Sequence, residues 1–235
     1  MSKGQVIVTG ASRGIGEAIA IELGRRGFDV VALSRSGKSP VGVGMVCDMT
    51  DEDSIASAIA GIGERGPIIG LVNNAGAHEA RPSAELSLSE FEACMRLNAS
   101  AVLVACREAY PYLRRSGEGL IVNIGSFFDR LAVSENLAYG ASKAAVGAMT
   151  RCLASEWAKD GIRVLDVAPG YIETDLNRDF LANEKVKSWL KRRVPVGRAG
   201  SADEVARLVG ALFSEKIGFL TGETIYIDGG QGANL

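Results

Sequence analysis

The sequence has few of the residues that build metal centres or disulfide frameworks. Its four cysteines form no C-x-x-C pair, and His78 is the single histidine. Structural zinc and a Cys–His nucleophile are therefore disfavoured, and we predict no metal site. Thiols without a disulfide framework are typical of a reducing compartment, and an apolar run begins within five residues of the start, which leaves no room for a signal peptide. We predict a cytoplasmic protein.

An excess of one charge and long apolar runs are also missing. The net charge is −2, so no basic surface predicts binding to nucleic acid or to anionic lipid. No uninterrupted apolar stretch reaches the length that spans a membrane. Hydrophobic residues make up 47% of the 235 residues, which is enough for a sizeable core. We therefore expect a soluble globular protein with a small-molecule partner, no nucleic acid and no membrane.

What the sequence does contain is a regular alternation of two patterns. Nearly continuous runs of Val, Ile and Leu are typical of strands covered on both faces of a sheet. We predict strands at Gln5–Thr9, Val30–Ser34, Gly44–Asp48, Ile69–Asn73, Gly119–Ile124, Arg163–Ala168 and Thr224–Ile227. Amphipathic patterns between them predict helices at Gly14–Arg26, Asp51–Glu64, Ser89–Arg115, Tyr139–Asp160 and Ala202–Ser214. This alternation predicts an α/β fold: one Rossmann-type domain over 1–235, with a doubly wound parallel sheet of about seven strands.

One region interrupts the alternation. Residues 171–198 lie between a predicted strand and the last predicted helix, and they are polar and charged, with a short helical pattern around Asn183–Arg193. A long insertion at the carboxyl end of a strand is where a substrate lid would lie. We therefore predict a substrate-binding loop at 171–198.

A glycine-rich turn follows the first predicted strand. Gly10, Gly14 and Gly16 let the backbone turn sharply and approach a ligand closely, and the helix that follows directs its first amides at a phosphate. The position after the first strand and before a helix favours a dinucleotide over a purely structural turn. No Gly-Lys-Ser/Thr closes the loop, so it is not a nucleoside triphosphate loop of the Walker type.

The end of the second predicted strand indicates which dinucleotide. A fold that uses NAD tends to place an acidic residue there, whereas this chain has Ser34 and Arg35. A guanidinium can bind a 2′-phosphate through two hydrogen bonds, and Arg13 of the glycine loop would approach the same phosphate. The alternative is that Arg35 is an ordinary surface arginine. We predict NADP(H) over NAD(H).

Tyr139 and Lys143 stand four residues apart, on one face of a predicted helix. Taken alone, this spacing suits a tyrosine at the edge of the core beside a solvated lysine. Reduction of a carbonyl needs a positioned acid, because a hydride goes to carbon and a proton goes to oxygen. A phenol ionises little near neutrality, and an ammonium one helical turn away favours its phenolate form.

Together these motifs resemble the short-chain dehydrogenase/reductase family over about 5–230. They occur in the family's order: T-G-x-x-x-G-x-G at 9–16, N-N-A-G at 73–76, S-x12-Y-x3-K at 126–143 and P-G-x-x-x-T at 169–174. The segments at 196–200 and 220–230 are similar to the 3-oxoacyl-[acyl-carrier-protein] reductase-like branch. One departure is Gly125, which stands where many relatives have a second serine.

The resemblance implies the residues of the site. Its catalytic set is Asn98, Ser126, Tyr139 and Lys143, in which the serine donates to the substrate oxygen and the asparagine holds a water relay. Lys143 would also bond the nicotinamide ribose. The implied cofactor-binding residues are Gly10, Ser12, Arg13, Gly14, Ile15, Gly16, Ser34, Arg35, Asp48, Met49, Asn74, Ala75, Gly76, Tyr139, Lys143, Pro169, Gly170, Ile172 and Thr174. His78 is interpreted as a loop residue near the rim of the cleft.

The leading functional hypothesis is an NADP(H)-dependent ketoreductase that also runs as a secondary-alcohol dehydrogenase. One alternative is a 3-oxoacyl-carrier-protein reductase, for which Lys187, Lys191, Arg192 and Arg193 could meet an acidic carrier. Another is a non-catalytic NADP(H) sensor, which retention of the full catalytic set disfavours. The resemblance also implies a homotetramer, or a homodimer, through the helices 89–115 and 139–160. Both helices carry more small and apolar residues than a single buried stripe needs, which agrees with contacts between subunits. These residues are Ala99, Ala101, Val102, Ala144, Ala145 and Ala148.

Overall fold

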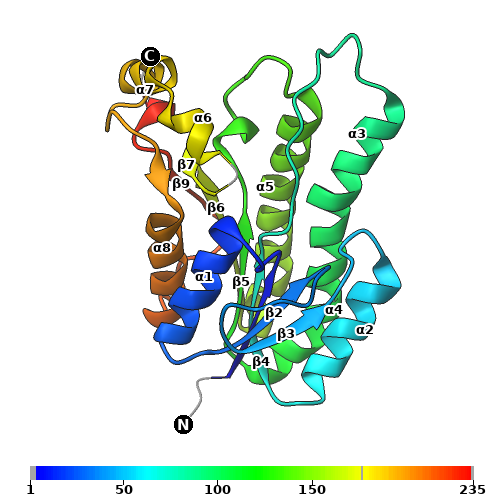
Figure 1. The fold of residues 1–235 in the computed structure, drawn as a ribbon. Coiled ribbons are helices and arrows are strands. Elements are labelled where there is room, and N and C mark those ends of the chain that lie inside the picture. Colours follow the sequence, from blue (N-terminus) through cyan, green and yellow to red (C-terminus); the bar gives the residue numbers. More distant parts are fainter. Residues whose placement is uncertain (1–3, 176, 234–235) are drawn as a thin grey trace.

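The alternating patterns fold into one twisted parallel sheet with helices on both faces (Figure 1). The computed structural model describes residues 4–175 and 177–233, and within them the main sheet has seven strands in the order β3-β2-β1-β4-β5-β6-β9. The strands are β1 (Gln5–Thr9), β2 (Asp29–Ser34), β3 (Val43–Val46), β4 (Ile68–Asn73), β5 (Gly119–Ile124), β6 (Ile162–Pro169) and β9 (Thr224–Ile227). The direction of winding reverses between β1 and β4, where such a sheet binds its ligand beyond the carboxyl ends of the strands. The predicted α/β fold is confirmed.

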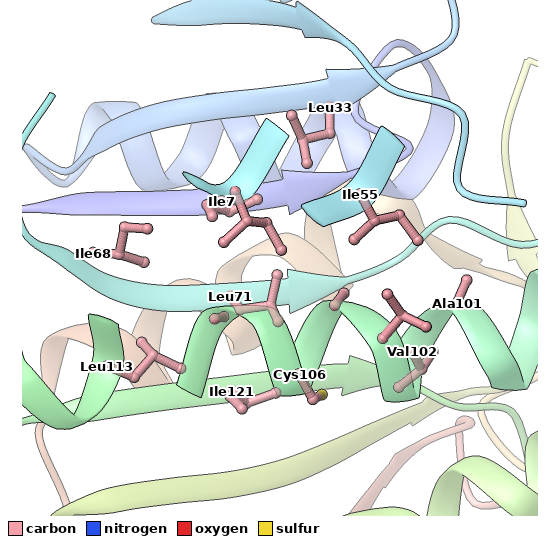
Figure 2. Close-up of a cluster of buried hydrophobic side chains, with 14 of the residues drawn as sticks. Ile7, Leu33, Ile55, Ile68, Leu71, Ala101, Val102, Cys106, Leu113 and Ile121 are labelled. Carbon is pink, nitrogen blue, oxygen red and sulfur yellow. The ribbon is translucent and has the colours of Figure 1, made fainter. Parts of the chain in front are cut away.

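Two apolar cores lie on opposite faces of the sheet, because consecutive strand residues point to opposite sides. One face is covered by α1 (Gly14–Arg25) and α8 (Ala202–Ser214), and the other by α2 (Glu52–Gly63), α4 (Ala101–Ser116) and α5 (Leu137–Trp157). We call them the α1/α8 face and the α4/α5 face. On β6, Leu165 belongs to the first core and Val164 to the second. Figure 2 shows the second core, in which Leu71 and Ile121 of the sheet lie beside Val102 of α4.

The long helix predicted over 89–115 is present as one unbroken helical run, but it is not α-helical throughout. It consists of α3 (Leu88–Met95), a π-helical turn at Arg96–Ser100 and α4. Asn98 lies inside that turn, and its side chain exchanges two hydrogen bonds of 2.9 Å with the backbone of Ala77. π-Helical turns within α-helices often mark functional sites, and here the wider turn accompanies a polar side chain that bonds to a neighbouring loop.

The region 171–198 carries short elements of its own. They are β7 (Ile172–Glu173), α6 (Arg178–Ala182) and α7 (Glu184–Arg193), and β7 pairs with β8 (Gly200–Ser201). A small cluster of Leu181, Leu190 and Val194 holds these elements together. The predicted helical pattern around Asn183–Arg193 is therefore present as α7. In 4–175 and 177–233, no helix is long and apolar enough to cross a membrane.

Candidate active site

The glycine-rich turn has the backbone that its sequence predicted. Gly10 and Gly14 have φ of +66° and +60°, a region that disfavours residues with a side chain. A Cβ on Gly10 would lie 2.9 Å from the Cα of Ala75, and one on Gly16 would lie 2.5 Å from the carbonyl oxygen of Gly10. The loop therefore packs directly on the N-N-A-G segment, with no room for side chains at these positions.

Asn74 holds the glycine loop in place. Its Nδ2 donates to the carbonyl oxygens of Thr9 at 3.0 Å and Gly10 at 3.2 Å, while Thr9 Oγ1 accepts from the amides of Asn74 and Ala75, both at 3.0 Å. The first turn of α1 has no side-chain cap, because Arg13 stands at the N-cap position. Its amides are thus available to a phosphate, and the site fits the pyrophosphate of a dinucleotide.

Positive charge gathers near the end of β2. Ser34 is buried there, whereas Arg35 and Arg13 are exposed, and neither guanidinium has a carboxylate within 4.0 Å among the described residues. Asp48 accepts from the amide and hydroxyl of Thr50, and these bonds, helped by the Arg35 charge, lower the pKa of its carboxyl. This end of the site therefore presents two unpaired cations to a ligand.

The remaining predicted cofactor residues divide into two groups. Ser12 is exposed beside the loop, and the methyl of Thr174 lies 3.7 Å from where a Cβ on Gly14 would stand, so the segment after Pro169 reaches the loop. In contrast, the Met49 side chain is buried in the core of the α4/α5 face, and Ile15 and Ile172 pack on the core of the α1/α8 face. Gly170 packs on the backbone of Asp228, 2.7 Å from a Cβ placed there. For these buried side chains, only backbone atoms remain to meet a ligand.

The structure brings three of the four predicted catalytic residues together at one point. Lys143 is 5% exposed, its Nζ donates to the carbonyl oxygen of Ile124 at 2.7 Å, and it lies 5.7 Å from the ring centre of Tyr139. A Cβ on Gly76 would stand 3.2 Å from Asn98 Oδ1 and 3.8 Å from Lys143 Nζ. The Lys143 ammonium and the Asn98 amide therefore lie beside the glycine that ends the N-N-A-G motif, and the Tyr139 ring lies next to the ammonium.

Ser126 and the single histidine complete this group. Ser126 follows β5, is 5% exposed, and its Oγ accepts from the amide of Phe128 at 3.3 Å. The Phe128 ring packs edge-on against Tyr139, with ring centres 5.3 Å apart. The His78 ring also packs against the Tyr139 ring, with ring centres 4.8 Å apart, and its Nε2 is hydrogen-bonded to Asn136 Oδ1. His78 lies in the loop that follows the N-N-A-G motif, and topology alone could not show that its imidazole touches Tyr139.

A line of aromatic contacts joins this group to the region 171–198. Phe128 contacts Phe127, Phe127 contacts Tyr171, and Tyr171 contacts Trp189 of α7, with ring centres 4.6, 5.0 and 5.2 Å apart. Burial raises the pKa of the Tyr171 hydroxyl. The predicted lid is thus packed on the residues that follow Ser126.

A row of polar side chains crosses the sheet beneath this group. Asn73, Asn123, Asp166 and Thr224 are register partners on β4, β5, β6 and β9, and we call them the polar row. Asn73 Nδ2 donates to Asn123 Oδ1 at 2.9 Å, and Thr224 Oγ1 donates to Asp166 Oδ2 at 3.2 Å. Asp166 is completely buried, and burial raises the pKa of its carboxyl to about 6. Sequence reasoning missed Asp166, although an acid within the apolar run 164–168 was a visible signal.

A doubly wound parallel sheet with a glycine loop at its switch point defines the class of Rossmann-type dinucleotide-binding proteins. Comparisons with known proteins narrow that class. The family model described as enoyl-(acyl carrier protein) reductase matches residues 10–231. Gluconate 5-dehydrogenase of Gluconobacter oxydans (strain 621H) is 34% identical over 248 residues, covering 100% of this chain and 97% of that relative.

Two further relatives agree. The 3-oxoacyl-[acyl-carrier-protein] reductase MabA of Mycobacterium tuberculosis (strain CDC 1551 / Oshkosh) is 34% identical over 229 residues, covering 97% of this chain and 92% of its own length. The structure of a gluconate 5-dehydrogenase from Burkholderia cenocepacia J2315, in complex with NADP and tartrate, superposes with a TM-score of 0.92. It is 30% identical, and the superposition covers 100% of this chain and 97% of that one. The chain belongs to the short-chain dehydrogenase/reductase family, and it is an NAD(P)-dependent oxidoreductase.

Proposed function

We propose that the protein is an NADP(H)-dependent oxidoreductase that reduces a ketone, or oxidises a secondary alcohol in the reverse direction. The observation that supports this most is the buried Lys143 ammonium, which lies beside the Tyr139 ring and is fixed by the Ile124 carbonyl. A buried cation next to a phenol favours the phenolate, and so equips the phenol for proton transfer.

Each residue then has a defined task. The nicotinamide of the bound cofactor would supply or accept the hydride. Tyr139 gives a proton to the carbonyl oxygen in reduction and takes it back in oxidation, while Ser126 donates a hydrogen bond to the same oxygen as charge develops. Asn98, bonded to the Ala77 backbone inside its π-helical turn, holds the proton path towards solvent. The amides that open α1 and the backbone around Gly10 would hold the pyrophosphate.

The preference for NADP(H) rests on Arg13 and Arg35. Both are exposed at the end of the site where the adenine ribose would lie, and the second strand ends without an acid. A Burkholderia relative was solved with NADP, which agrees with this choice. Two guanidinium groups without carboxylate partners suit a dianionic 2′-phosphate, to which charge-assisted hydrogen bonds each contribute about 1.5–3 kcal/mol.

Arg35→Asp tests the cofactor assignment. The carboxylate would repel the 2′-phosphate, so the ratio of kcat/KM for NADPH to that for NADH should fall about ten- to a hundredfold. Arg65→Asp makes the same charge reversal at an exposed arginine near the amino ends of the strands, and should leave the ratio unchanged. A wild-type enzyme that prefers NADH, or an unchanged ratio in Arg35→Asp, would contradict the assignment.

One observation favours the alternative of a carrier-bound substrate. The last turn of α7 carries Lys191, Arg192 and Arg193, all exposed on the segment that packs over the site. Lys187 is already paired with Glu184 at 2.9 Å, which leaves it less suited to a partner. A substrate screen separates a small-molecule carbonyl substrate from a carrier-bound one. It would include keto sugars, keto acids and a 3-oxoacyl group, the last offered both on a carrier protein and on a small thiol. A preference of more than about tenfold in kcat/KM for the carrier-bound form would favour the alternative.

The structure removes part of the sequence evidence for the predicted homotetramer or homodimer. Ala99, Ala101 and Val102 are buried within this chain and are not left for a partner, whereas Ala144 and Ala148 of α5 are exposed. The homotetramer, the homodimer and the cytoplasmic location stay predictions. Light scattering at micromolar concentration would decide the assembly, and a monomer would overturn it.

A further inference from the structure

The α4/α5 face carries a buried carboxylate that has no task in the proposed reaction. Asp166 stands in the middle of β6 with its Oδ2 accepting from the Thr224 hydroxyl. Among the described residues its Oδ1 has no hydrogen-bond partner apart from the nearby Gly125 amide, which donates mainly to the Val167 carbonyl at 2.8 Å and lowers the pKa of the carboxyl. An unpaired, buried carboxylate oxygen is costly to keep, so its presence beside the site points to a functional reason.

The chain makes room for this carboxylate at Gly125, the residue before Ser126. A Cβ on Gly125 would lie 2.5 Å from Oδ1 and 2.6 Å from Oδ2 of Asp166. Both distances are far below van der Waals contact, so a side chain at 125 and this carboxylate exclude each other. The Asp166 carboxylate therefore fills the space immediately behind the Ser126 backbone.

Lys143 is the cation that acts on Asp166. Burial raises the pKa of Asp166, while the Lys143 ammonium and the Thr224 hydroxyl oppose that rise. The other charged or titratable groups on the surrounding elements are Arg151 of α5, Asp129 and Arg130 of the turn after β5, and Tyr226 of β9.

Three of these other groups, Asp129, Arg130 and Tyr226, are committed to one another. The Tyr226 hydroxyl donates to Asp129 at 2.7 Å, and Arg130 lies over the Tyr226 ring at 3.8 Å. The Asp129 charge raises the pKa of Asp166 and so cannot stabilise its carboxylate. Arg151 lies near Thr224, since a Cβ on Gly147 would stand 3.6 Å from its Nη1 and 3.9 Å from Thr224 Oγ1. Lys143 and Asp166 meet the same stretch of backbone, because Lys143 Nζ bonds the Ile124 carbonyl and the carboxylate packs on the next residue, Gly125. Lys143 is the cation that lowers the pKa of Asp166.

We propose that Asp166 is a positioning residue of the proposed reaction: its carboxylate is the buried counter-charge of Lys143, and it moderates the attraction of the ammonium for a phenolate at Tyr139. This inference rests on the proposed function. Because Lys143 Nζ is fixed on the Ile124 carbonyl at 2.7 Å, Asp166 acts through its charge and not by moving the lysine. An ionised Asp166 partly cancels the field of Lys143, and a neutral residue at 166 leaves that field at full strength.

Asp166→Asn tests this directly, because it removes the charge and keeps the size. The midpoint of the rise of kcat/KM with pH, measured for alcohol oxidation, should move down by about one pH unit. Asp160→Asn is the control: Asp160 accepts from the Tyr110 hydroxyl at 2.9 Å at the far end of α5, and its loss should not move the midpoint. A midpoint in Asp166→Asn that stays in place or moves up overturns the proposal.

A second readout does not depend on turnover. The tyrosinate absorbance of Tyr139 is the part of the absorbance that Tyr139→Phe removes, and it can be followed against pH without substrate. Its midpoint should be lower in Asp166→Asn than in the wild type, by the same shift as the midpoint of kcat/KM. If no carbonyl compound were turned over, the proposed function would fail while this titration still decided the role of Asp166. Should Asp166→Asn not fold, Asp166→Ala with Gly125→Ala removes the charge and refills the space, and the same downward shift is expected.

Discussion

Two neighbouring rows of the same sheet differ sharply in chemistry. On the α1/α8 face, Val8, Val72, Val122 and Leu165 are register partners on four strands, all fully buried in an apolar core. One residue further along three of these strands, on the α4/α5 face, runs the polar row that ends at Asp166 and Thr224. The proposed catalytic group of Asn98, Tyr139 and Lys143 lies on the α4/α5 face, and we infer that the polar row gives up stability for function while the apolar row supplies stability.

The two faces therefore should respond differently to substitution. Each Å² of apolar surface removed from water stabilises the folded state by about 25 cal/mol, so the buried side chains of the apolar row stabilise the fold. A buried carboxylate costs free energy unless it is fully hydrogen-bonded. Substitutions in the apolar row should change stability with activity per folded molecule retained. Substitutions of the proposed catalytic group should change activity, and substitution of Asp166 should change both.

Lys143→Ala should give the largest effect. It removes the ammonium that we propose to favour the phenolate and to bind the cofactor ribose, so kcat/KM should fall by about a thousandfold or more. Lys159→Ala removes an exposed lysine just beyond α5 and should leave kcat/KM unchanged. Steady-state kinetics on both variants measures the difference. Comparable losses of kcat/KM in the two variants would contradict a specific role for the buried Lys143.

Leu165→Ala tests the opposite face. The leucine is fully buried in the α1/α8 core, so its truncation should lower the free energy of unfolding by about 2–5 kcal/mol. Activity per folded molecule should stay within about twofold of the wild type, because the site lies across the sheet. Urea unfolding and kinetics on the same samples measure both quantities. A Leu165→Ala enzyme that keeps its stability and loses its activity would contradict the assignment of stability to the apolar row.

Asp166→Asn should stabilise the protein in a pH-dependent way. Burial raises the pKa of Asp166 to about 6 in the folded state, from an ordinary value near 3.8, so the ionised carboxylate opposes folding as pH rises through this window. The substitution should therefore raise the free energy of unfolding by about 2 kcal/mol more at about pH 7 than at about pH 4, where the folded state is protonated and the unfolded state is partly ionised. Urea unfolding at the two pH values measures this difference, and an equal change at both would contradict it.

The fold could be predicted from the sequence because its signals are local. Runs of β-branched residues, the amphipathic helices and the glycine turn each depend on near neighbours, and every predicted strand of the sheet is present. The family motifs brought Asn98, Tyr139 and Lys143 into one hypothesis, and the structure places Asn98 and Lys143 beside Gly76 and the Tyr139 ring next to Lys143.

Other features depend on contacts between distant segments, which spacing does not encode. The π-helical turn at Asn98 forms where the side chain meets Ala77, and His78 reaches Tyr139 only because Asn136 holds it there. The partnership of Gly125 with Asp166 spans two strands, and its only sequence signal was a departure from the family's usual serine beside an acid in an apolar run. Such polar residues in buried strands merit attention in any sequence of this class.

The proposed reaction depends most on Tyr139, which we propose as its acid on the α4/α5 face. Tyr139→Phe keeps the ring that packs on Phe128 and His78 and removes only the hydroxyl. With the best carbonyl substrate and NADPH, we predict a fall in kcat/KM of about a hundred- to ten-thousandfold, with NADPH affinity within about threefold of the wild type. A Tyr139→Phe enzyme that reduces its substrates at near-wild-type rates would contradict the account.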